Sequence, residues 1–249
     1  DASSLPLRAL AGTLPGRPAY RGTFEFIGNA GAAGGPWTGQ LSARVRGGEL
    51  SHRRASGKIE TLALGDIEAN VLAAADHFAA SLSTRATDRT ELTADLRVER
   101  GAGEMSSQRL SGRLGLTTHD LGLVPLFVPD IDRPSGRIVA EIAAGGTVGA
   151  PEVAGTARLE DGALDFYRTN LRLREVAARL GFAENALDID AHARAGDGSL
   201  AVNGRLAWQA GVISGRIGLT GESLAVIDLP EARILASPDL KLAIDGQRI

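Results

Sequence analysis

Cysteine is absent from the 249 residues of this chain, and aromatic residues make up only 4% of it. Without cysteine the chain can form no disulfide, no thiolate zinc site and no cysteine nucleophile. The net charge of −3 argues against a nucleic-acid-binding surface, which is usually basic. No run reaches the roughly 18 apolar residues of a membrane-spanning helix. The chain starts at Asp1 without a signal peptide, and we interpret it as a segment of a longer protein whose other parts could hold an anchor.

Residue patterns typical of catalytic sites are also missing. No serine occupies a Gly-x-Ser-x-Gly elbow, and the glycine-rich segment 28–35 is followed by no Lys-Ser/Thr pair of a phosphate-binding loop. The histidines lack metal-ligand spacing; they are His52, His77, His119 and His192. We therefore predict a non-enzyme that needs no metal and no cofactor.

Two pairs of carboxylates share a strand face and could in principle carry acid–base chemistry or bind a cation. They are Asp188 with Asp190, and Asp95 with Glu99. Both pairs point away from the apolar side of their strands, so we interpret them as a hydrated outer surface.

Alternation of apolar and polar residues with a period of two dominates the chain. It is clear in the segments 92–99, 187–194 and 240–245, and weaker in 137–142. Because successive side chains of a strand point to opposite faces, each of these strands has one apolar and one polar side. Helical signal is scarce: the Ala-rich segment 67–80 fits either a short helix or two strands.

Glycine punctuates these strands. Small residue–Gly pairs resemble strand openers, and they include Gly39, Gly57, Gly112, Gly136, Gly155, Gly204 and Gly215. Turns are predicted at Gly47-Gly48, Asp161-Gly162, Asp197-Gly198 and Asp245-Gly246. We expect a flexible loop at 28–35 and a helical turn or cap at 121–128. This spacing indicates degenerate repetition of hairpins, which favours an elongated sheet.

The apolar face of such a sheet must be covered, yet the sequence offers almost no helices and few bulky residues. We therefore predict an all-β fold: an elongated, curved sheet folded into a trough with an apolar inner face. The trough spans 1–249 without a clear linker, with a sub-boundary near 121–134. There Pro125 and Pro129 bracket an apolar segment, Leu126 to Val128, that either gates the trough or breaks the sheet.

Residues 121–206 resemble the TamB family of inner-membrane-anchored translocation and assembly module proteins. The similarity is carried by 121–130 (LGLVPLFVPD), 135–142 (SGRIVAEI), 145–162 (GGTVGAPEVAGTARLEDG), 187–191 (LDIDA) and 196–206 (GDGSLAVNGRL). The ending at 221–224 and 238–246 is similar as well. The resemblance implies a β-taco, a folded sheet with an apolar lumen that also occurs in AsmA-like and bridge-like lipid-transfer proteins. It further implies a periplasmic location, an inner-membrane anchor in a Gram-negative bacterium and a TamA-like outer-membrane barrel partner.

The implied function is transport of phospholipid between the two membranes and support of outer-membrane protein assembly. On that basis we expect contact with acyl chains at Ile138, Ile142, Leu159, Leu164, Phe166, Leu171, Leu173, Leu187, Ile189, Leu200, Val202, Leu206, Trp208, Ile217, Leu219, Leu224, Val226, Leu240, Leu242 and Ile244. The alternative is that these residues form an ordinary self-packed core. A basic cluster of Arg44, Arg46, His52, Arg53 and Arg54 either meets anionic headgroups or forms a solvated face.

Two further functions stay open. A scaffold could assist outer-membrane proteins by adding a strand to the sheet edge. A parallel β-helix enzyme acting on polysaccharide would need converging carboxylates and aromatic platforms, which the sequence does not supply.

Overall fold

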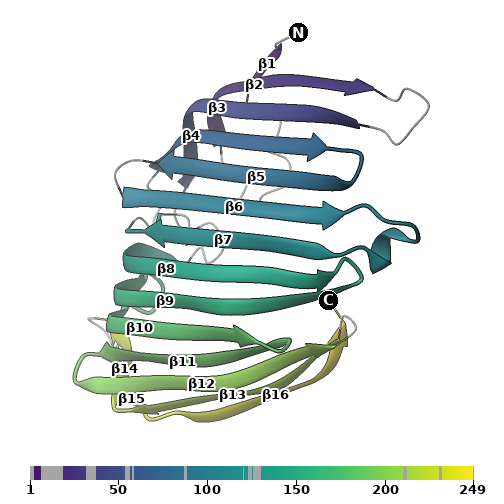
Figure 1. Cartoon of the computed structure of the whole chain (residues 1–249). Coiled ribbons are helices and arrows are strands. Elements are labelled where there is room, and N and C mark those ends of the chain that lie inside the picture. Colours follow the sequence, from purple (N-terminus) through teal and green to yellow (C-terminus); the bar gives the residue numbers. More distant parts are fainter. Residues whose placement is uncertain are drawn as a thin grey trace. The chain divides into compact units, whose positions relative to one another are not determined.

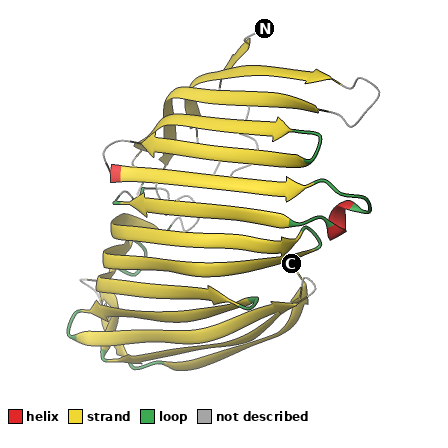
Figure 2. Ribbon diagram, in the orientation of Figure 1, coloured by secondary structure: helices red, strands yellow, loops and turns green. Residues whose placement is uncertain are grey.

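The computed structural model describes residues 3–6, 19–31, 38–53, 57, 59–86, 89–119, 121–122, 125, 130–209, 212–229 and 232–248. Nearly all of them lie in β-strands (Figure 1, Figure 2). In the described part of the chain, fourteen strands form one antiparallel sheet in chain order, except that β16 follows β13. The strands β14 and β15 form a separate two-stranded sheet. The predicted all-β class with one long sheet is confirmed. None of the described helices is long and apolar enough to cross a membrane.

The chain divides into two compact units. Unit 1 comprises residues 1–53, 59–117 and 141–153, and unit 2 comprises 54–58, 118–140 and 154–249. Unit 1 holds β1 (Ser3–Pro6), β2 (Ala19–Gly31), β3 (Thr38–Arg53), β4 (Ile59–Ala73), β5 (His77–Ala86), β6 (Thr90–Glu99), the 3₁₀ helix η3 (Met105–Ser107) and most of β7 (Leu110–Thr118). The strands β8 (Ile131–Thr147) and β9 (Ala150–Phe166) contribute to both units.

Unit 2 continues with β10 (Leu171–Ala183), β11 (Ala186–Ala195), β12 (Gly198–Gln209), β13 (Val212–Glu222), β14 (Leu224–Leu229), β15 (Ala232–Ala236) and β16 (Asp239–Arg248). Its strand register confirms the predicted alternation. Leu187 pairs with Leu206 and Ala191 with Val202, so their side chains share one face. The intervening Asp188 is exposed on the other face.

The ambiguous segment 67–80 forms the end of β4 and the start of β5, so the two-strand alternative is correct. The loop predicted at 28–35 is wrong for 28–31, which lie in β2, while 32–35 fall outside the described residues. The apolar segment Leu126 to Val128 and Pro129 also lie outside the described residues. Pro125 is described and is buried.

Several predicted strand openers are wrong, because the glycines lie inside strands. They are Gly136 in β8, Gly155 in β9, Gly204 in β12 and Gly215 in β13. At Gly215, where φ is +153°, a Cβ atom would collide with the carbonyl oxygen of Arg205 on β12. The small residue is therefore required by close approach of the neighbouring strand, a need that resembles a strand start in sequence.

Three of the four predicted turns are likewise wrong. Gly47-Gly48, Asp161-Gly162 and Asp245-Gly246 lie within β3, β9 and β16. The register shifts between Val45 and Gly48, where Gly47 has φ +57°. Left-handed backbone at a register shift marks a β-bulge, which bends a strand without ending it. Only Asp197-Gly198 lies at a chain reversal, between β11 and β12.

Candidate functional site: an open apolar face in unit 1

One face of the unit 1 sheet is built from apolar residues in register. Across β4, β5 and β6, Ala69 lies opposite Leu82 and Leu82 opposite Ala94. The neighbouring row joins five strands and consists of Gly28, Leu41, Val71, Ala80 and Leu96. Large side chains thus stand beside alanine or glycine, which leaves hollows between them.

The first hollow is a groove of about 450 Å³. Its apolar lining comes from Ala69, Val71, Ala80, Leu82, Ala94, Leu96, Gly112, Leu114, Ile142 and Ala144. Val71 and Leu96 remain 44% and 43% exposed, although both belong to the apolar face. This volume lies within the range of 300–1,000 Å³ that is common for small-molecule sites.

A second groove of about 460 Å³ is lined by Phe26, Leu41, Val71, Ala73, Phe78 and their small neighbours. Val71 lines both grooves. The guanidinium of Arg100 lies 3.8 Å from the centroid of the Phe78 ring, and its Nη1 donates a 2.8 Å hydrogen bond to the Ala74 carbonyl oxygen. A cation–π contact therefore places positive charge beside an apolar groove.

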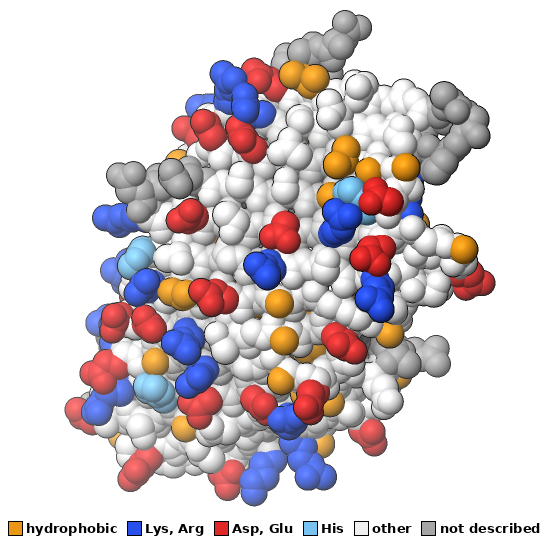
Figure 3. Space-filling model, in the orientation of Figure 1, with side chains coloured by type: hydrophobic (Ala, Val, Ile, Leu, Met, Phe, Trp, Pro, Cys, Tyr) orange, Lys and Arg blue, Asp and Glu red, His pale blue; other side chains and the backbone are white. Residues whose placement is uncertain are grey.

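The opposite face of unit 1 is mostly polar, although Ile27 and Leu72 are exposed on it. Arg44 donates hydrogen bonds to Glu68, with a distance of 2.8 Å from Nε to Oε1. Arg46 Nε lies 3.6 Å from Glu25 Oε2. The space-filling view shows acidic and basic side chains interspersed (Figure 3). Arg44 and Arg46 are thus in ion pairs; Arg54 and the side chains of His52 and Arg53 lie outside the described part of the chain.

Ionisable groups gather at the turn between β4 and β5. Asp76 Oδ1 lies 2.7 Å from His77 Nδ1, and this hydrogen bond is the main reason why the pKa of Asp76 is lowered. Among the described residues, no group of three or more His, Asp or Glu side chains is arranged to hold a metal ion.

Unit 2 fills part of its own apolar face. Leu173, Val176, Ala193, Ala195 and Leu224 are buried together. Packed against them are the partly buried Leu159, Leu164, Phe166, Leu171, Leu200 and Val226. Eight residues that the sequence predicts to contact lipid therefore lie in a self-packed cluster.

The other twelve predicted contacts are distributed differently. Ile142 lines the first groove of unit 1. Leu240 and Leu242 on β16 are 60% and 57% exposed. Partial burial is shared by Ile138, Leu187, Ile189, Val202, Leu206, Trp208, Ile217, Leu219 and Ile244. Contact of these residues with lipid stays a prediction.

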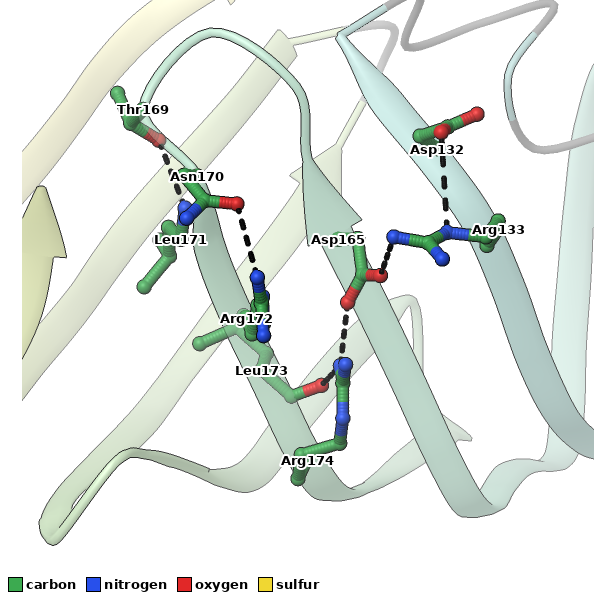
Figure 4. Close-up of polar contacts among 9 residues, drawn as sticks. All are labelled: Asp132, Arg133, Asp165, Thr169, Asn170, Leu171, Arg172, Leu173 and Arg174. Atoms are coloured by element: carbon green, nitrogen blue, oxygen red, sulfur yellow. Dashed lines mark hydrogen bonds and ion pairs between the residues drawn. The ribbon is translucent and has the colours of Figure 1, made fainter. Parts of the chain in front are cut away.

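A polar cluster on unit 2 ties three strands together (Figure 4). The Asp165 carboxylate on β9 is only 14% exposed and lies 3.0 Å from Arg133 Nη2 on β8. Arg174 on β10 donates a hydrogen bond to the other oxygen of Asp165 through Nη1. Of the predicted carboxylate pairs, Asp188 receives two hydrogen bonds from Arg205 Nη1, at 2.9 and 2.7 Å. Asp95, Glu99 and Asp190 are exposed, in agreement with a hydrated outer surface.

Sequence reasoning placed its lipid-contact residues at 138 and beyond, and so missed nearly all of the open grooves. The available signal was the alternation in 92–99 together with the segment 67–80, whose alanines obscured two strands of the same face. In comparisons with known proteins, the chain matches no family model, no curated protein and no solved structure.

Proposed function

We propose that unit 1 binds the acyl chains of phospholipid on its apolar face, as the periplasmic segment of a non-catalytic lipid carrier. The observation that supports this is the pair of grooves, with the exposed Val71 lining both and the exposed Leu96 lining the first. Exposed aliphatic side chains arranged in a concave surface are typical of ligand sites rather than of ordinary protein surface. Each methylene buried there contributes about 0.8 kcal/mol.

The wider setting of the proposal comes from the sequence resemblance. In it, the full-length protein is anchored in the inner membrane of a Gram-negative bacterium and acts with a TamA-like barrel protein of the outer membrane. It moves phospholipid between the membranes and supports outer-membrane protein assembly. Fluorescent phospholipid transfer from donor to acceptor vesicles measures the first activity, and cell fractionation checks the location.

Site-specific photo-crosslinking tests lipid binding directly. A photoreactive residue replaces Leu96 in one variant and Asp95 in another, and each protein is irradiated with radiolabelled phospholipid vesicles. Neighbouring positions on one strand face opposite ways, so we expect label at 96 and little at 95. Ile189 and Asp190 form the corresponding pair in unit 2. Equal labelling within both pairs would exclude a one-sided lipid site.

A strand-addition scaffold is the second candidate function. It is favoured by β16, which ends the strand order of the main sheet and has highly exposed Leu240 and Leu242. An edge strand of this kind can template an added strand through its free backbone groups. A crosslinker at 241 that captures unfolded outer-membrane protein, while 96 captures no lipid, would select this function over lipid binding.

A further inference from the structure

The β14–β15 hairpin is an excursion from the main sheet. Thr220 on β13 pairs with Asp239 on β16, so the ladder is complete without the residues between them. At the base of the excursion, the Gly221 amide donates to the Pro238 carbonyl oxygen at 2.8 Å. The Ser223 amide donates to Ser237 Oγ at 3.1 Å. Strands β13 and β16 are therefore paired with each other independently of the hairpin.

The hairpin lies over the apolar face of unit 2. Strand β14 contacts β10, β11 and β12, and its Leu224, only 4% exposed, packs with the core residues Leu173 and Ala193. Because β14 and β15 form a sheet of their own, side chains rather than a shared ladder hold the hairpin against these strands. The backbone ladder of β10, β11 and β12 therefore does not include the hairpin.

The strands below the hairpin carry small residues where it docks. On β11 the large Leu187 and Ile189 give way to Ala193 and Ala195 along the same face. The space left by the alanines is filled by Leu224. In unit 1 a similar mixture of large and small residues leaves open grooves, whereas in unit 2 the hairpin packs on the small residues.

We propose that the β14–β15 hairpin is a displaceable cap over a second acyl-chain site formed by β10, β11 and β12. This inference rests on the proposed function of unit 1, because it assigns the same ligand class to the second site. The wall is aliphatic apart from Phe166, so it fits a fatty acyl chain. Ser223 connects β13 to the hairpin in the left-handed conformation, with φ +50°.

Titration with cis-parinaric acid, a fluorescent fatty acid, tests the cap. In one variant Gly-Gly replaces residues 224–236, which leaves the Thr220–Asp239 pairing and the base of the hairpin in place. We expect this variant to bind more ligand per chain than the native protein. The additional binding should survive Leu96→Glu, which places a charge in the unit 1 groove.

The outcomes separate the two proposals. In one outcome, the native protein binds parinaric acid, Leu96→Glu abolishes this binding, and removal of the hairpin adds no further binding. This outcome would leave the proposed function standing and overturn the cap. No native binding, but binding to the shortened variant, would overturn the proposed function of unit 1 and support the cap. Absence of binding in both proteins would overturn both.

Hydrogen exchange on the intact chain covers the case in which the shortened variant does not fold. Amides of β14 and β15 should exchange roughly tenfold or more faster than those of β11 and β12, because a cap opens by local unfolding. A Cβ at Gly196 would lie 3.8 Å from the Ala225 Cβ, a separation typical of a disulfide. Oxidised Gly196→Cys/Ala225→Cys should slow exchange in the hairpin, and reduction should restore it. Equal exchange of hairpin and sheet amides in the native protein would overturn the cap.

Discussion

Ala80 on β5 lies directly opposite Leu96 on β6, so a methyl group faces an isobutyl group across the two strands. The next apolar row reverses the order, with Leu82 opposite Ala94. Large and small side chains thus alternate both along each strand and across the two strands. The small side chains leave space between the large ones, and this space is part of the groove. The size of the small residues therefore controls how much room a ligand finds.

Filling the groove should weaken lipid binding while leaving the fold intact. In Ala80→Leu, the added carbon atoms take the place of about two ligand methylenes, which corresponds to roughly a tenfold loss of affinity for parinaric acid. Stability in urea should change by less than about 0.5 kcal/mol, since Ala80 borders open space. The control is Ala79→Leu, whose side chain lies on the polar face. Equal loss of binding in both variants would contradict the assignment of the site.

Close approach of strands predicts a contrast between two glycines of β13. Gly215→Ala should lower the free energy of unfolding by about 2–4 kcal/mol, because the new Cβ would collide with the Arg205 carbonyl oxygen and the φ of +153° disfavours alanine. At Gly218 the nearest contact of a Cβ would be 3.7 Å away, so Gly218→Ala serves as the matched control. Urea denaturation followed by circular dichroism measures both. Similar losses of unfolding free energy at 215 and 218 would contradict this account of the close strand approach.

How much of this could be read from the sequence is shown by two leucines. Leu224 and Leu240 each follow a polar residue and begin a largely apolar segment, and both are expected on the lipid-facing side. The structure buries Leu224 to 4% exposure under its own hairpin and leaves Leu240 60% exposed at the sheet edge. Alternation predicts the face of a residue correctly but does not reveal what covers that face, because cover depends on contacts between distant segments.

The grooves of unit 1 were hidden for a different reason. Ala69, Ala73 and Ala80 lie where alanine content favours a helix on propensity alone. Cross-strand neighbours such as Leu82 override that preference by packing in the sheet. Glycine was misleading as well, since bulges such as Asp161-Gly162 use the same residues as turns.

The three-strand contact at Asp165 predicts a measurable electrostatic contribution. Asp165→Asn should destabilise unit 2 by about 1–2 kcal/mol, between the values for exposed and buried ion pairs, because the carboxylate is mostly buried while its arginine partners are not. Asp188→Asn removes the ion pair with Arg205, in which both side chains are exposed. It should lower the free energy of unfolding by less than about 0.5 kcal/mol. Added salt should narrow the difference in stability loss between Asp165→Asn and Asp188→Asn. A larger cost at 188 than at 165 would contradict the prediction.

The turn residue Asp76 predicts a pH effect with a definite sign. Its hydrogen bond with His77 lowers the pKa of Asp76 in the folded state. A carboxyl group with a depressed folded-state pKa stabilises the fold above its ordinary value of 3.8, and this contribution is lost as the pH falls through the folded-state pKa. Melting temperatures measured from neutral to strongly acidic pH should therefore fall more steeply for the native protein than for Asp76→Asn. Parallel curves would show that the contact has no effect on stability.

Two residues expected to line a lipid site should differ strongly in how much stability their truncation costs. Leu173→Ala removes a side chain that packs in the unit 2 core and should cost about 2–5 kcal/mol of unfolding free energy, because it leaves a cavity. Leu240→Ala removes one that is 60% exposed, so its cost should stay below about 1 kcal/mol. Urea titrations without lipid measure both values. A small cost at 173 would mean that the core is loosely filled in solution, and phospholipid should then raise the stability of the native protein more than that of the variant. A large cost at 173, unchanged by lipid, would show that the hairpin and the sheet fill this space themselves while the cap is closed.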